Sequence, residues 1–75
     1  MKLNPSANIP HFLQTVQSCR GDVHYLTPDG DDLNLKSALA QFLFAAVVAG
    51  QLEELPGEIS LQEPDDQSVL QRYLL

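Results

Sequence analysis

The spacing of the apolar residues changes abruptly at Ser37, and this change constrains the fold more than any other feature of the chain. Before Ser37, Leu33 and Leu35 alternate with polar residues, which is the period of a β-strand with one buried face. After Ser37, apolar residues recur at the spacing of a helix with one buried face: Ala38, Leu39, Phe42, Leu43 and Ala46. We therefore expect the chain to pass directly from a strand into a helix that Ser37 caps with its hydroxyl.

Similar patterns predict the other elements. We expect an edge strand over residues 1–4, a helix over about 9–19, strands over 23–27 and 58–62, and an acidic helix from Pro64 onward. A turn at residues 28–31 makes a hairpin, Gly50 ends the second helix, and residues 53–57 form a loop. The order strand, helix, strand, strand, helix, strand, helix predicts an α+β domain of two layers, because the strands alternate and so bury one face only.

The composition bounds the size of the protein and the class of its partners. Its 75 residues, 44% of them apolar, suffice for one domain over residues 1–75 that folds alone. Ten acidic and four basic residues give a net charge of −6, which opposes nucleic acid and anionic membranes and favours a basic partner over an acidic one. No stretch is typical of a signal peptide or long enough to span a bilayer, so we expect a cytoplasmic protein. The single cysteine, Cys19, lies on an apolar helix face and is expected to be a buried structural thiol.

Three short segments keep the order and spacing of a known family: Phe12-Leu13-Gln14-Thr15, Gly21-Asp22-Val23 and Leu33-Asn34-Leu35-Lys36-Ser37. Over about residues 9–75 the chain resembles the HPr family, the bacterial phosphocarrier proteins of the sugar phosphotransferase system. The resemblance implies an HPr-like βαββαβα sandwich, in which three helices cover one face of a four-stranded antiparallel sheet. The short first strand would leave the edge beside the fourth strand less covered.

The phosphate-carrying site of that family is missing. In the family a His-x-Arg-Pro-like segment opens the first helix, whereas residues 4–11 here are Asn-Pro-Ser-Ala-Asn-Ile-Pro-His. Aligning the segment through Gln14-Thr15 places Pro5 and Ala7 at the positions of the family's histidine and arginine. Aligning it on Pro10 places Ala7 and Ile9 there. Neither alignment supplies an imidazole or a guanidinium. His11 lies about one turn further along, and we expect it to be a surface or half-buried histidine beside Phe12. The chain therefore resembles a degenerate HPr-like member without the active-site histidine, and His11 is the phosphate carrier only in the alternative of a divergent phosphocarrier.

Ser37 has two interpretations. The residues alone favour a plain helix cap, because serine is a preferred residue at that position. The resemblance implies that Ser37 is the target of a regulatory kinase, and a phosphate there would meet free backbone amides and the positive end of the helix dipole. Regulatory phosphorylation of Ser37 is therefore a second hypothesis.

The second predicted helix is long and unusually apolar. Phe44, Val47 and Val48 lie beside its predicted core stripe, so they are candidates for a protein-binding surface or for a homodimer interface. Alternatively, the extra residues pack onto the edge that the short first strand leaves exposed. The partner's identity does not follow from the sequence.

We predict no catalytic, metal or cofactor site. The acidic turn at residues 29–32 lacks the ligand spacing of a calcium loop, and His24 has no second metal ligand at suitable spacing. The carboxylates of residues 53–54 are expected in a solvated loop and those of residues 65–66 at the start of a helix. Nothing in the sequence buries either group or sets them opposite each other, so they do not form a catalytic pair. The sequence thus predicts a non-enzymatic, HPr-like regulatory or protein-interaction domain, with a divergent phosphocarrier and a structural homodimer as the alternatives.

Overall fold

The computed structural model of the chain describes residues 1–48 and 57–75. Within them it contains three α-helices, three strands and two short 3-10 helices, in the order α1 (Ile9–Val16), β1 (Val23–Leu26), β2 (Asp32–Asn34), α2 (Ala38–Val48), β3 (Glu58–Leu61), η1 (Pro64–Asp66), α3 (Gln67–Leu70) and η2 (Gln71–Tyr73). The predicted α+β class is confirmed. The expected helix end at Gly50 and most of the expected loop over residues 53–57 lie outside the described residues.

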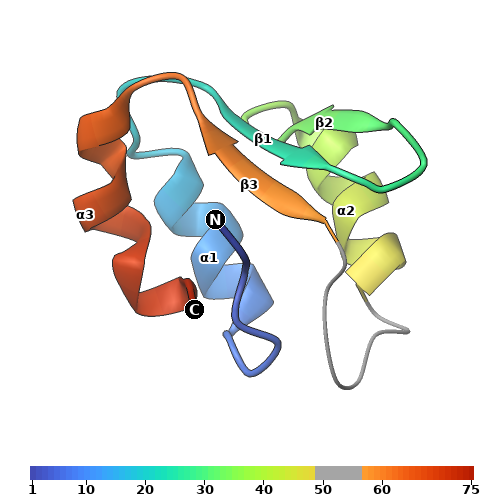
Figure 1. Ribbon diagram of the computed structural model, residues 1–75, viewed down its shortest axis with the longest axis horizontal. Coiled ribbons are helices and arrows are strands. Elements are labelled where there is room, and N and C mark those ends of the chain that lie inside the picture. Colours follow the sequence, from blue (N-terminus) through green and yellow to red (C-terminus); the bar gives the residue numbers. More distant parts are fainter. Residues whose placement is uncertain (49–56) are drawn as a thin grey trace.

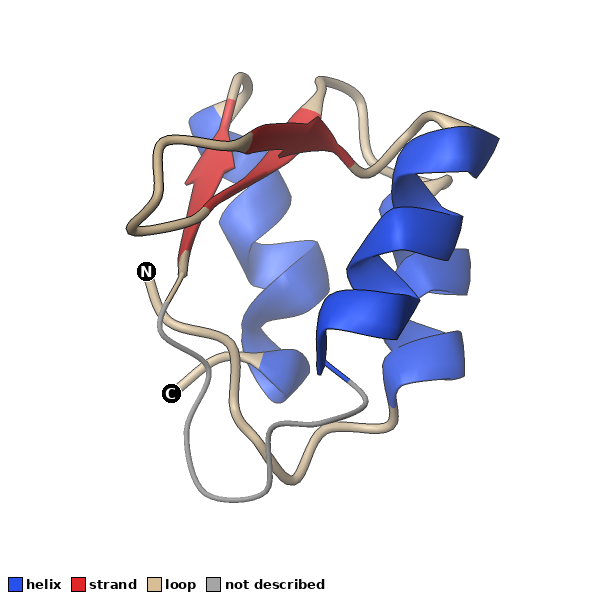
Figure 2. Ribbon diagram, turned by 90° about the vertical axis from the view of Figure 1, so that its right-hand side faces the viewer, coloured by secondary structure: helices blue, strands red, loops and turns tan. Residues whose placement is uncertain are grey.

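The strands form an antiparallel sheet in the order β2-β1-β3, so that β1 is the central strand and β3 has a free edge. Tyr25 of β1 lies opposite Leu33 of β2 and opposite Ile59 of β3. Figures 1 and 2 show all three helices on the same side of this sheet, with α1 and α3 next to each other and α2 beneath the β1–β2 hairpin. The predicted arrangement of two layers is therefore present.

The expected first strand over residues 1–4 is not formed, and the described residues contain three strands where four were expected. The backbone of this segment divides its hydrogen bonds between two neighbours. Met1 exchanges two of them with Ile59 at the free edge of β3, with N···O distances of 2.6 and 3.4 Å. Leu3, in contrast, forms an isolated antiparallel bridge with Leu74 near the C-terminus. Neither pairing is long enough to make a ladder, and Pro5, which has no backbone N–H, ends the segment.

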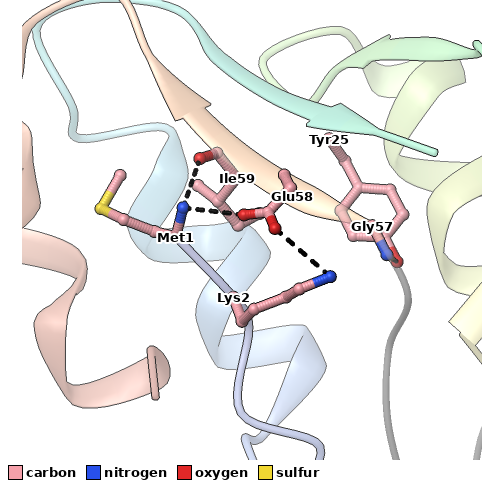
Figure 3. A network of polar contacts seen from close by, with 6 residues as sticks. All are labelled: Met1, Lys2, Tyr25, Gly57, Glu58 and Ile59. Carbon is pink, nitrogen blue, oxygen red and sulfur yellow. Dashed lines mark hydrogen bonds and ion pairs between the residues drawn. The ribbon is translucent and has the colours of Figure 1, made fainter. Parts of the chain in front are cut away.

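Figure 3 shows the side chains that hold the N-terminal residues on the sheet. The amine of Met1 donates to Glu58 Oε2 over 2.9 Å, and Lys2 Nζ lies 3.4 Å from Glu58 Oε1. The hydrogen bond from the N-terminal amine, aided by Lys2, lowers the pKa of Glu58. Beside them, the ring of Tyr25 lies flat over Gly57, where a Cβ atom would stand 2.3 Å from the ring, so only glycine fits this position.

Helix α1 ends at Val16, earlier than the residue 19 predicted from the apolar stripe. The hydroxyl of Ser18 donates to the carbonyl oxygen of Thr15 over 2.7 Å, and backbone bonds of the tighter i to i−3 type follow up to Cys19. Such side-chain bonds compete with the helix ladder. Cys19 is nevertheless buried, as predicted, with 5% of its surface exposed, and burial is the main cause of the raised pKa of its thiol.

The core is centred on four aromatic rings that are spread along the chain. The ring of Phe12 in α1 lies 6.0 Å from that of Phe44 in α2 and 5.6 Å from that of Tyr73 in η2. The ring of Phe44 in turn lies 4.9 Å from that of Tyr25, in an edge-to-face arrangement. These contacts join all three helical regions to the central strand.

A buried carboxylate fastens the C-terminal helical region to the end of α1. Asp66 is 2% exposed, and its two oxygens accept hydrogen bonds from the backbone amides of Arg20 and Gly21 over 3.0 and 2.9 Å. These amides lower the pKa of Asp66, since they stabilise the ionised form. Asp66 lies in the first turn of a helical element, as expected. The sequence analysis did not expect its burial, because its partners are backbone groups more than forty positions away.

The anchoring role of Asp66 predicts a pH-dependent loss of stability. Because the folded pKa is lowered, the stabilisation is present above the unfolded pKa of about 4 and is lost as the pH falls through the folded pKa. Asp66→Asn should therefore lower the free energy of unfolding near neutral pH, and its difference from the wild type should shrink at lower pH. Urea unfolding at a series of pH values measures this difference. The exposed neighbour Asp65→Asn is the control, and an Asp66→Asn deficit that is constant with pH would contradict the assignment.

Candidate functional site

Helix α2 turns a different face to the core than the sequence predicted. Its buried side chains are Ala40, Phe44 and Val48, which follow one another by one turn. The prediction that Phe44 and Val48 form an exposed binding surface is therefore wrong, since they are 0% and 8% exposed. The side chain of Val47 lies outside what the structure describes. The error has a physical cause: only Gln41 is polar among the eleven residues of α2, so apolar spacing predicts a helix but does not select its buried face.

Gln41 helps to fix the rotation of α2. Its Nε2 donates to the carbonyl oxygen of Leu35 over 2.8 Å and is 3.4 Å from that of Leu13. The one polar side chain of the helix thus bonds both to the segment after β2 and to α1. Together with the aromatic contacts of Phe44, these bonds leave the opposite side of α2 facing outward.

We define the outer face of α2 by the residues on that opposite side: Leu39, Phe42, Leu43 and Ala46. Leu39 is 69% exposed, Phe42 73% and Leu43 45%. The sequence analysis had placed these residues in the core stripe, so that expectation is wrong as well. Large apolar side chains gathered on one helix face make that face a candidate contact surface, whereas scattered ones would need no explanation.

A groove runs beside the outer face, between α2 and the β1–β2 hairpin seen in Figure 1. It has a volume of about 440 Å³ and is lined by Thr27, Asp31, Leu33, Leu43 and Ala46. Three of these five residues are apolar, and two belong to the outer face itself. The outer face and the groove are therefore one continuous apolar surface with a carboxylate at its rim.

Hydrogen bonds within the hairpin turn fix the backbone of Asp31. The backbone amide of Asp31 donates to the hydroxyl of Thr27 over 3.0 Å, and the amide of Thr27 donates to the carbonyl oxygen of Asp31 over 2.9 Å. Between them Gly30 has a φ of 93°, a conformation that favours glycine. The next acidic residue along, Asp32, contacts His24 on β1, with 2.6 Å between Oδ1 and Nδ1.

Ser37 caps α2, which confirms the interpretation drawn from the residues alone. Its carbonyl oxygen accepts the first helical hydrogen bond from the amide of Gln41 over 2.9 Å, and its Oγ lies 3.4 Å from the amide of Ala40. The side chain is exposed, and it stands two residues before Leu39 of the outer face. A chemical group added to this hydroxyl would therefore change the end of the helix that carries the outer face.

His11 is an exposed residue in the first turn of α1, where Asn8 is the cap and accepts a hydrogen bond from the His11 amide over 3.1 Å. It lies in a hollow of about 460 Å³ at this helix end, together with residues from both ends of the chain: Asn4, Ser6, Ala7, Asn8, His11, Arg72 and Tyr73. Arg72 supplies the guanidinium that the N-terminal segment lacks. Sequence reasoning missed that these two residues line one hollow, because they are far apart in the chain and no local motif links them.

The described residues contain no group of three or more histidine, cysteine, aspartate or glutamate side chains placed to hold a metal ion. Within the same residues, none of the helices is both long enough and apolar enough to cross a membrane. Comparison with protein-family models, with curated proteins and with solved structures finds no match for this chain. The function is therefore argued from three features: the outer face with its groove, Ser37, and the hollow around His11.

The assignment of buried and outer faces predicts opposite behaviour for two phenylalanines of α2. Phe44→Ala should lower the free energy of unfolding by about 3–5 kcal/mol, because it removes a fully buried ring and leaves a cavity. Phe42→Ala should change it by less than about 0.5 kcal/mol, because the Phe42 ring is largely in solvent. Urea unfolding of both variants measures the difference. Similar losses for the two, or a larger loss for Phe42→Ala, would contradict the rotation of the helix described above.

Proposed function

We propose that this chain is a non-catalytic protein-interaction domain of HPr-like architecture, which binds a protein partner through the outer face of α2. The observation that carries the proposal is the exposure of Leu39, Phe42 and Leu43 side by side on one helix, next to an apolar groove. Aromatic and aliphatic side chains of this kind form the centres of protein interfaces. The outer face contains no acid, base or nucleophile, so binding rather than catalysis suits it.

The order of the elements supports the HPr-like part of the proposal. From α1 to α3 the sequence of helices and strands is the one that the family resemblance implies. The family's first strand would lie beside the last one, and Met1 bonds to Ile59 at the free edge of that strand, β3. In this proposal the N-terminal residues are a shortened remnant of the first strand.

Phosphorylation of Ser37 is the proposed control of binding. The hydroxyl is exposed at the start of α2, and a phosphate would add a charge of about −1.5 to −2 there. That charge would stand within a turn of Leu39, at the edge of the outer face. A partner that buries this edge would have to accommodate or exclude the phosphate, so the modification would change the affinity.

The second candidate function is that of a divergent phosphocarrier that uses His11. One observation favours it, namely that His11 and Arg72 line the same hollow at the start of α1. An imidazole could carry the phosphoryl group there and a guanidinium could hold its oxygens. We rank it second because His11 already lies inside the first helical turn, with its own amide bonded to Asn8.

A structural homodimer through the outer face is the third candidate.

We also propose that the protein acts in the cytoplasm, because its one cysteine, Cys19, is a buried free thiol that suits a reducing compartment. The net charge of −6 supports a protein partner over nucleic acid or an anionic membrane.

The interaction proposal predicts that a charge on the outer face abolishes partner capture without unfolding the domain. The immobilised wild type and a Phe42→Lys variant would be incubated with lysate of the source cells, and the retained proteins compared by mass spectrometry. Val69→Lys is the matched control, since Val69 is an exposed apolar residue on α3. The proposal predicts proteins retained by the wild type and by Val69→Lys but not by Phe42→Lys. Identical sets for all three would contradict it.

Intact mass separates the proposed regulation from the second candidate function. The protein would be incubated once with the serine kinase of the HPr family and ATP, and once with the phosphotransfer enzyme and phosphoenolpyruvate. We expect one stable phosphate in the first incubation, absent in Ser37→Ala, and none in the second. An acid-labile phosphate in the second incubation, absent in His11→Ala, would instead support a phosphocarrier.

A further inference from the structure

Among the described residues that line the groove, the charged side chain is the carboxylate of Asp31. Asp29 lies exposed in the same hairpin turn. The helix on the other side of the groove, α2, carries no charged residue. A molecule that docks along α2 therefore meets apolar side chains in the centre and the carboxylate of Asp31 at one rim, with Asp29 in the same turn.

The basic residues of the chain lie elsewhere. Lys2 contacts Glu58 beside β3, and Arg72 lines the hollow at the start of α1. Lys36 precedes α2, but its Nζ donates to the carbonyl oxygen of Cys19. Arg20, the remaining one of the four, follows α1. None of the four is among the described residues that line the groove, so no basic side chain of that lining neutralises the carboxylate of Asp31.

The spacing of the outer face suits another helix. Its residues stand at positions i, i+3, i+4 and i+7 of α2, which is the pattern by which one amphipathic helix packs against another. The helix has 11 residues and a length of about 16 Å, so it can contact about three turns of a partner helix. The groove beside it gives room for a second row of side chains from that partner.

A second copy of this chain is a poor occupant. Each copy has a net charge of −6, and the groove of each would bring its own acidic rim to the interface. Like charges brought together at an interface oppose association. The rim instead attracts lysine or arginine.

We infer that the groove between α2 and the β1–β2 hairpin binds a basic amphipathic helix of a partner protein. Its apolar residues contact Leu39, Phe42 and Leu43, and its lysine or arginine residues face Asp29 and Asp31. This inference rests on the proposed function and adds the chemical class of the partner to it. The hydrogen bonds of the hairpin turn fix the backbone of Asp31 before binding, so this backbone needs little further ordering when the partner binds.

Two labelled synthetic peptides test the inference with the whole chain. Both are amphipathic helices of about 18 residues, or five turns, with leucine on one face, and they differ only in carrying lysine or glutamate on the other face. Fluorescence anisotropy measures the affinity of each at low and at physiological salt. We expect the lysine peptide to bind, more weakly at higher salt, and the glutamate peptide to bind at least about tenfold more weakly.

Variants with matched controls locate the contact. Leu43→Ser should weaken binding of the lysine peptide by about tenfold or more, whereas Val69→Ser should not change it, since the two side chains are similarly exposed at 45% and 42%. Asp31→Asn should weaken binding of the lysine peptide by about two- to fivefold. Asp65→Asn removes an exposed carboxylate elsewhere on the surface, so it should weaken binding less.

The outcomes separate the inference from the proposed function. Equal binding of the two peptides would overturn the basic partner, and so would equal losses of affinity in Asp31→Asn and Asp65→Asn. If Leu43→Ser still weakens binding in either case, the outer face remains the contact surface. If Leu43→Ser has no effect, the proposed function fails too. If the wild type binds neither peptide, the proposal of a helical partner is overturned. If analytical ultracentrifugation then shows a dimer that Leu43→Ser abolishes, the occupant of the groove is a second copy of this chain.

Discussion

The rest of the structure depends on the packing of Phe44. Its ring lies between those of Phe12 and Tyr25, at 6.0 and 4.9 Å, and so joins α2 to α1 and to the central strand. Aromatic rings bury more surface than any other side chain, so one such position can decide how a uniformly apolar helix is rotated. Once Phe44 points inward, Phe42 must point outward, because two residues along a helix differ by about 200° in direction. The outer face is thus a consequence of how the core is packed.

The elements could be predicted from the sequence much better than the face that α2 buries. Alternation before Ser37 and helical spacing after it predicted the junction, and the helices and hairpin form near their expected positions. Phe44 and Val48 were nevertheless expected outside and Leu39 inside. In α1, polar residues mark the outer side, whereas in α2 only Gln41 is polar. The spacing of the apolar residues in α2 therefore predicted a helix, but it did not predict which side of that helix is buried.

Pairings between distant residues could not be predicted either. Asp66 bonds to amides near the end of α1, Arg72 joins His11 in one hollow, and Met1 bonds to β3 at the other end of the chain. Each pairing depends on the tertiary fold, which brings both termini to one region, and none follows from local propensity or spacing. The N-terminal residues show the same effect, since their hydrogen bonds are divided between two neighbours and a full strand does not form.

The most direct measurement is the solvent accessibility of the α2 side chains by NMR, with a soluble paramagnetic agent added to the labelled protein. Our account predicts strong broadening of the Leu39 and Leu43 methyl signals and of the Phe42 ring signals. The ring of Phe44 and the methyl groups of Val48 should be protected. The reverse pattern, with Phe44 and Val48 broadened and Leu39 and Phe42 protected, would contradict the rotation of α2 and with it the binding surface proposed on its outer face.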